Sequence, residues 1–183
     1  MCIFNDESII EREISRERVF DGILLHIDHA MYRLPNGKPA AREIARHVGA
    51  AAVLPVDSEG NVYLVRQFRA PLDRVLLEIP AGKLDSPDED RLLAAKRELR
   101  EETGLEADNW LHLTDTFNAA GYSSECISLY LARGLHVGQA QPDEDEFLNL
   151  VKMPFKEAFD MVMRGEIRDA KTQIVLCMAK HIL

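Results

Sequence analysis

The segment from Gly82 to Leu105 constrains this chain most, because it combines the start signal and the stop signal of one helix. Ser86 is a favourable N-cap, Pro87 suits the first helical position, and Glu89 completes a capping box with Ser86. Gly104 is placed to end the helix in a left-handed conformation. We therefore predict a helix between these two signals.

This helix has an apolar stripe beside an acidic face. The stripe, with the spacing of residues that pack on a core, consists of Leu92, Ala95 and Leu99. Glu98, Glu101 and Glu102 share the acidic face, because residues three and four apart are neighbours on a helix. Like charges so placed destabilise a bare helix by roughly 0.2–0.5 kcal/mol per pair. Taken alone, such a run is more often a solvated face. A bound cation is the alternative, because carboxylate oxygens are the ligands that Mg²⁺ and Mn²⁺ prefer.

The complete string resembles the signature of the Nudix hydrolases. Glu89, seven further residues and then Arg97-Glu98-Leu99-Arg100-Glu101-Glu102-Thr103-Gly104-Leu105 fit it without a gap. Gly82 precedes Glu89 by one residue more than the signature has, which indicates an insertion in the preceding loop, where insertions are tolerated. The runs 65–69, 77–84 and 33–38 resemble the branch that cleaves ADP-ribose and other nucleoside diphosphate sugars.

The resemblance implies a metal site that holds two or three Mg²⁺ ions, with Mn²⁺ as an alternative. Its expected ligands are Glu98, Glu102, Glu146 and the backbone carbonyl of Ala81. Glu101 is expected to ligate or to support a ligand, and Arg97 to hold the carboxylates in place. A pyrophosphate site also needs a base to take a proton from the attacking water. By resemblance that base is Glu144, in the acidic run 143–146.

The same resemblance implies a substrate site formed by Arg42, Arg69, Glu78 and Gly121. The expected reaction is hydrolysis of ADP-ribose to AMP and ribose 5-phosphate. Members specific for ADP-ribose carry a proline about fifteen residues past the signature, where this chain has Ala120. Another nucleotide sugar or a dinucleotide is therefore an alternative substrate. A non-catalytic nucleotide sensor ranks lower, because this chain keeps the carboxylates of the signature.

Composition limits the function further. The 183 residues carry a net charge of −9, with 46% hydrophobic and 29% charged residues, as expected for one globular chain that buries a core. The acidic balance disfavours nucleic acid as a partner. The sequence shows neither an apolar run of membrane-spanning length nor a signal peptide, and three widely spaced cysteines predict no zinc site. We expect a cytoplasmic enzyme acting on a small nucleotide.

Hydrophobic patterning predicts an α/β fold with two regions. Strands at 19–32 and 42–47, joined by a turn at 35–37, predict a small antiparallel sheet in residues 1–47, after a loosely ordered start. By resemblance this sheet forms a homodimer and contacts substrate. Residues 48–183 are expected to form the Nudix hydrolase domain, an α/β/α sandwich around a mixed sheet. Its strands are expected at 49–56, 62–68, 76–79, 110–117, 126–132 and 146–152, and its last helices at 154–164 and 170–182.

Overall fold

The computed structural model describes residues 6–138 and 147–183. The chain divides into two compact units, each described here by itself. The first unit contains the residues up to His47 together with Ala119–Glu125, and the second contains Val48–Asn118 and Cys126–Leu183. No helix in the described part of the chain is long and apolar enough to cross a membrane.

The second unit contains seven strands, three α-helices and a short 3₁₀ helix at Ala70–Leu72 in its described residues. The strands are β4 (Ala50–Val56), β5 (Asn61–Arg69), β6 (Arg74–Glu78), β7 (Ala81–Lys83), β8 (Leu105–Thr116), β9 (Ile127–Val137) and β10 (Leu148–Pro154). The helices are α1 (Arg91–Thr103), α2 (Phe155–Met163) and α3 (Ala170–Ala179). All the strands and helices predicted beyond residue 48 are present, with shifted ends.

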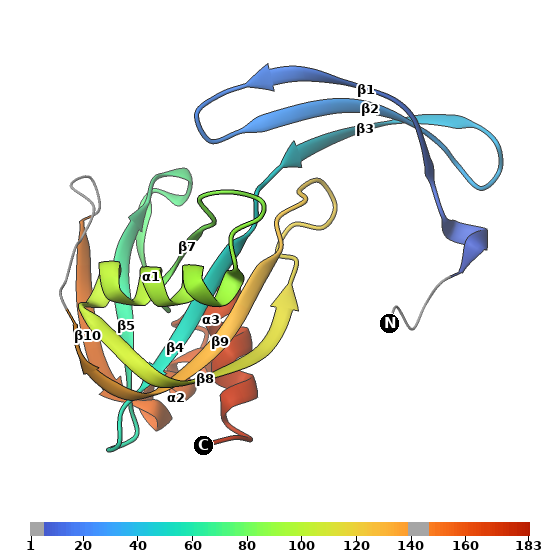
Figure 1. Ribbon diagram of the computed structural model, residues 1–183. Coiled ribbons are helices and arrows are strands. Elements are labelled where there is room, and N and C mark those ends of the chain that lie inside the picture. The colour runs from blue at the N-terminus through green and yellow to red at the C-terminus, as the bar shows by residue number, and fades with distance from the viewer. Residues whose placement is uncertain (1–5, 139–146) are drawn as a thin grey trace. The chain divides into compact units, whose positions relative to one another are not determined.

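The strands of this unit form one mixed sheet (Figure 1). Along the main path the order is β10-β5-β4-β9-β8, while β6 pairs with β5 and β7 pairs with β4. β4 and β9 run parallel at the centre, and the other pairs are antiparallel. β4 is buried along its whole length, which agrees with its continuous run of small apolar residues.

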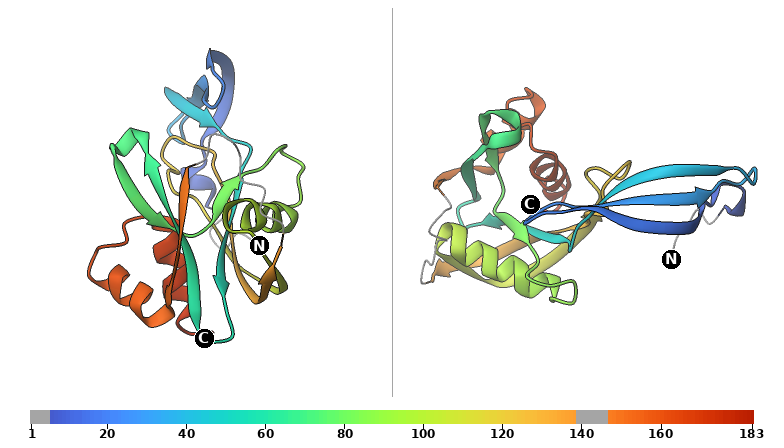
Figure 2. Two further views of the ribbon diagram at one scale, coloured as in Figure 1. Left: turned by 90° about the vertical axis from the view of Figure 1, so that its left-hand side faces the viewer. Right: turned by 90° about the horizontal axis from the view of Figure 1, so that it is seen from above.

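Helices cover both faces of the sheet, with α1 on one side and α2 and α3 on the other (Figure 2). Alternate residues of β4 point to opposite faces. Leu54 belongs to the core with Val175 and Leu176 of α3, whereas Val53 belongs to the core with Leu99 of α1. The predicted α/β/α sandwich around a mixed sheet is therefore confirmed.

The predicted start of α1 is wrong, and its predicted end is confirmed. The helix begins at Arg91, and its N-cap is Asp90, whose carboxylate accepts hydrogen bonds from the N–H groups of Leu92 and Leu93. Glu89 instead accepts from the N–H of Asp85, so the capping box with Ser86 does not form. Asp90 is as good a cap as Ser86, and it stands next to the apolar stripe. Gly104 ends the helix with φ of 69°.

The first unit contains a three-stranded antiparallel sheet in the order β1-β2-β3. Its strands are β1 (Arg12–Asp21), β2 (His26–Arg33) and β3 (Pro39–Arg46). The single strand predicted at 19–32 is wrong, because a turn at 22–25 divides it between β1 and β2. Residues before 12, expected to be loosely ordered, include a short 3₁₀ helix at Glu7–Ile9. The turn predicted at 35–37 is present, with Gly37 at φ of 82°.

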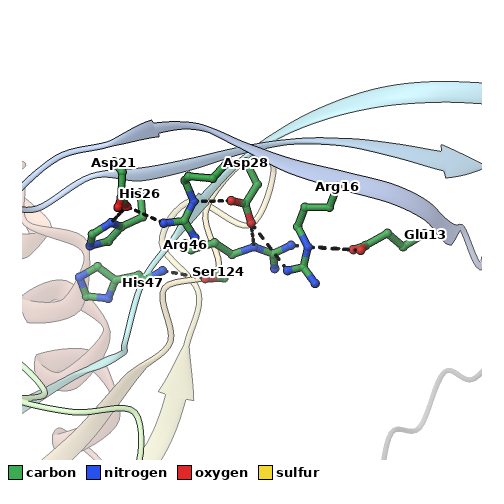
Figure 3. Close-up of polar contacts among 9 residues, drawn as sticks. Glu13, Arg16, Asp21, His26, Asp28, Arg46, His47 and Ser124 are labelled. Atoms are coloured by element: carbon green, nitrogen blue, oxygen red, sulfur yellow. Dashed lines mark hydrogen bonds and ion pairs between the residues drawn. The ribbon is translucent and has the colours of Figure 1, made fainter.

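Charged side chains take the place of a hydrophobic core in the first unit. Among its described residues, Asp28 and Ala30 are the buried ones, and every residue of β1 is exposed. Asp28 accepts hydrogen bonds from Arg18 Nε at 2.6 Å and Arg46 Nε at 2.8 Å, and Arg16 lies 3.7 Å away (Figure 3). The hydrogen bonds from Arg18 and Arg46 lower the pKa of Asp28. The sheet is thus held together around one buried carboxylate.

Candidate functional site

Arg97 holds together the acidic face of α1. Its Nη1 donates to Glu98 Oε1 at 2.7 Å and to Glu101 Oε2 at 3.0 Å. Its Nη2 donates to the carbonyl of Lys83 at 3.1 Å, and its Nε lies 3.4 Å from Glu89 Oε1. Burial would lower the pKa of Arg97, but Glu98 and the other carboxylates outweigh it and raise this pKa. A permanently charged guanidinium therefore fixes the carboxylates against β7.

The residues Ala81 and Gly82 of β7 lie against this face of α1. The N–H of Ala81 donates to Glu102 Oε2 at 3.1 Å. A Cβ added at Gly82 would lie 2.1 Å from Glu98 Oε1, so the absence of a side chain there makes room for the carboxylate. Residues Ala81–Lys83 pair with β4 as a strand. That pairing brings the β7 backbone close to the helix.

The arrangement has the donor chemistry of a divalent-cation site. Glu98 is 7% exposed, and it and Glu102 supply hard oxygen donors beside the Ala81 backbone. Among residues 6–138 and 147–183, no three His, Cys, Asp or Glu side chains form a metal-binding group. Glu144 and Glu146, the expected base and third carboxylate ligand, lie outside the described residues. The negative charge on the helix face nevertheless suits a cation.

A second cluster forms just before Ala81 in the chain, around Glu78. This residue is 1% exposed, and its two oxygens accept from Arg69 Nε and Nη2, each at 2.7 Å. Lys171 of α3 also donates to Glu78. Burial would raise the pKa of Glu78, but Arg69 and Lys171 outweigh it and lower this pKa. The structure therefore pairs two of the predicted substrate residues in an ion pair whose carboxylate is buried and whose guanidinium is partly exposed.

Helix α3 supports this segment from the other side. Its N-cap is Asp169, whose carboxylate accepts from Lys171 Nζ at 2.9 Å and from Thr172 Oγ1 at 2.6 Å. Thr172 Oγ1 in turn accepts from the N–H of Ile79 at 2.8 Å. Sequence reasoning missed these residues. A lysine in the first turn of a helix is disfavoured by the helix dipole, and this signal could have pointed to a carboxylate partner for Lys171.

The two other predicted substrate residues, Arg42 and Gly121, belong to the first unit. Arg42 lies on β3 and donates to Glu11 and to the carbonyl of Ala41. Gly121 lies in the loop 119–125, which pairs with β3 through the hydrogen bond from Ala45 N–H to the Tyr122 carbonyl. A Cβ added at Gly121 would meet nothing within 4 Å. This loop also contains Ala120.

The chain belongs to the Nudix family, because residues 45–174 match the model described as the NUDIX domain. This match covers the mixed sheet, the acidic helix and the start of α3. The family predicted from the signature is therefore confirmed, as is the predicted class of enzyme, a pyrophosphohydrolase.

Two relatives and one solved structure extend this finding. The ADP-ribose pyrophosphatase of Bacillus subtilis (strain 168) is 39% identical over 168 residues, which are 91% of this chain and 90% of that protein. The methanol dehydrogenase activator of Bacillus methanolicus is 38% identical over 168 residues, with the same shares covered. The crystal structure of an ADP compounds hydrolase aligns with a TM-score of 0.82 at 24% identity over 94% of each chain, and shows that the fold is shared.

Proposed function

We propose that this chain hydrolyses the diphosphate bond of nucleoside diphosphate sugars, and that ADP-ribose is its preferred substrate. The products would be AMP and ribose 5-phosphate, with water attacking one phosphorus and breaking its P–O bond to the bridging oxygen of the diphosphate. The observation that carries the proposal is the placement of the Glu98 and Glu102 carboxylates against Ala81 and Gly82. The similarity to an ADP-ribose pyrophosphatase over 91% of the chain supports the choice of substrate.

The proposed metal ligands are Glu98, Glu102, Glu146 and the Ala81 carbonyl, and two or three Mg²⁺ ions, or Mn²⁺ ions, are the proposed cofactors. Bound divalent ions would neutralise the diphosphate and lower the pKa of a coordinated water. Arg97 orients Glu98 and Glu101, so that their oxygens are in place before substrate arrives. Glu144 is the proposed base that takes the proton of the attacking water.

The proposed substrate contacts are the residues expected from the resemblance. Arg69, held at its Nε and Nη2 by Glu78, is the proposed contact for the diphosphate. Arg42 and Gly121 are proposed contacts for the terminal ribose and the adenine.

The first unit exposes Ile14, Val19 and Phe20 along β1, and a three-stranded sheet with so little buried is marginal in water. We therefore propose a homodimer in which this sheet is covered.

The experiment is a substrate panel with Mg²⁺, in which the released nucleoside monophosphate is measured by chromatography. The panel contains ADP-ribose, GDP-mannose, a diadenosine polyphosphate and a nucleoside triphosphate. We expect the highest kcat/KM with ADP-ribose, loss of activity with a chelator, and recovery when Mg²⁺ is added back. A higher kcat/KM with another nucleotide sugar would show that ADP-ribose is not the preferred substrate. Ala120, which stands where ADP-ribose-specific members carry proline, is the reason to test this alternative.

The site is tested with Glu98→Gln and Glu102→Gln, which keep the size of each side chain and remove its charge. We expect a fall in kcat of at least about 100-fold for each, because a lost metal ligand removes the stabilisation of charge in the transition state. Glu157→Gln, an exposed position on α2, is the matched control and retains activity. Near-normal turnover in both site variants would show that the assignment is wrong.

A further inference from the structure

Lys171 is a buried charge with two carboxylate partners. Its side chain is 8% exposed, and its Nζ donates both to Glu78 and, at 2.9 Å, to Asp169 Oδ1. Lysine is almost never this deeply buried unless it is paired. The ammonium therefore compensates two carboxylates at once, one from β6 and one from the cap of α3.

Arg69 is the outer end of the same cluster. Its side chain is 38% exposed, and two of its three nitrogens are held by Glu78. Its Nη1 makes no hydrogen bond with the described part of the chain. The carboxylates of Glu78, Asp169 and Glu102 all raise the pKa of Arg69, so this guanidinium lies within the field of both the buried cluster and the acidic helix. A guanidinium that is held through Nε and Nη2 and still has N–H groups on Nη1 to donate can bind a phosphate.

We infer that Lys171 is a positioning residue, which sets how much of the Arg69 charge is available to the substrate diphosphate. The inference rests on the proposed function. In the native cluster two carboxylates face two cations, so the cluster is neutral. Without the ammonium of Lys171, Arg69 alone would have to compensate both Glu78 and Asp169. Its charge would then be drawn toward the buried carboxylates, and the local charge met by an anionic substrate would become negative.

Three variants separate charge from structure. Lys171→Met removes the ammonium and keeps the length of the side chain, which leaves the cluster with a net charge of −1. Asp169→Asn gives a net charge of +1 and keeps a favourable helix cap, because asparagine and aspartate cap equally well. The double variant Lys171→Met/Asp169→Asn is neutral again. The control is Gln173→Ala, which removes a 2.7 Å hydrogen bond from α3 to the carbonyl of Ile167 without changing any charge.

The measured quantities are kcat and KM for ADP-ribose with Mg²⁺ at two salt concentrations. A KM that rises while kcat stays unchanged indicates that binding of the ground state and of the transition state is weakened equally. For Lys171→Met we expect KM to rise by about 10-fold. Asp169→Asn is expected to lower KM, and the double variant to return to within about 2-fold of the native KM, since the field depends on net charge. Added salt should reduce these differences.

A purely structural role gives a different pattern. It would lower Tm in Lys171→Met and in the Gln173→Ala control alike, leave KM unchanged, and show no rescue in the double variant; that pattern would overturn the inference. If Lys171→Met does not fold, Asp169→Asn still decides, because an unchanged or raised KM contradicts the inference.

Failure of the proposed function is recognised separately. If the native protein does not turn over ADP-ribose, calorimetry with the methylene-bridged analogue of ADP-ribose measures binding without turnover. Weaker binding in Lys171→Met, restored in the double variant, would support the role of Lys171 even then. Absence of analogue binding to the native protein would reject both ideas.

Discussion

Gly82→Ala tests the space on which the candidate site depends. The added Cβ would lie 2.1 Å from Glu98 Oε1 and 2.2 Å from Glu98 Cδ, whereas ordinary contact begins at 3.4 Å. The carboxylate would therefore have to move by about 1.3 Å. Glu98 is 7% exposed and bonded to Arg97, so this shift would disturb the hydrogen bond that orients its carboxylate. A misplacement of about 1 Å at a reacting centre costs on the order of 100-fold in rate, or about 2.7 kcal/mol.

The assay measures kcat for ADP-ribose hydrolysis with saturating Mg²⁺, together with Tm. We expect kcat to fall by about 100-fold, while the protein still unfolds cooperatively. Gly60→Ala is the matched control, because Gly60 has φ of 81° and nothing within 4 Å of the added Cβ. It should lower stability by about 1–2 kcal/mol through backbone strain and leave kcat unchanged. Native kcat in folded Gly82→Ala would refute the claim that the position of Glu98 matters.

Three further predictions concern stability. Asp90→Ala should lower Tm by about 2–4 °C, because a lost N-cap costs about 1 kcal/mol, and an unchanged Tm in calorimetry would contradict that role. Burial would raise the pKa of Asp57, but hydrogen bonds from Lys152 and Asn61 leave it well below 3.8. In urea titrations the native chain should therefore exceed Asp57→Asn in stability at pH 7 and lose this advantage as the pH falls below 3.8; an advantage independent of pH would argue against it. Asp28→Asn should speed amide exchange in β1 and β2 and leave α1 protected, and uniform exchange throughout would speak against separate units.

Patterns local in the sequence predicted much of the fold. The end of α1 followed from Gly104, and the central strand followed from the apolar run 50–56, because each signal acts within a few residues. The start of α1 did not follow, since Ser86 and Asp90 are both good caps. The packing of the apolar stripe decides between them. The strand at 19–32 was missed as two strands because Gly22 was not taken as a turn signal.

The candidate site was predictable where one helix carries it. Glu98, Glu101 and Glu102 lie within two helical turns, so their spacing placed them on one face, whereas the role of Arg97 was expected from the resemblance. The support from Lys171 and Thr172 was not predictable from spacing, because these residues are 93 positions from the groups they bond. Such long-range pairs depend on how α3 packs on the sheet, and no local pattern contains that information.

The hydrogen bonds that join α3 with Glu78 and Ile79 also bear on the order in which this protein matures. During synthesis the acidic helix leaves the ribosome long before residues 171 and 172 do. Until then the segment of Glu78 and Ile79 lacks the hydrogen bonds that join it to α3. A nascent chain would thus contain the whole signature and still lack a rigid candidate site, so hydrolytic activity should emerge only after α3 has been synthesised.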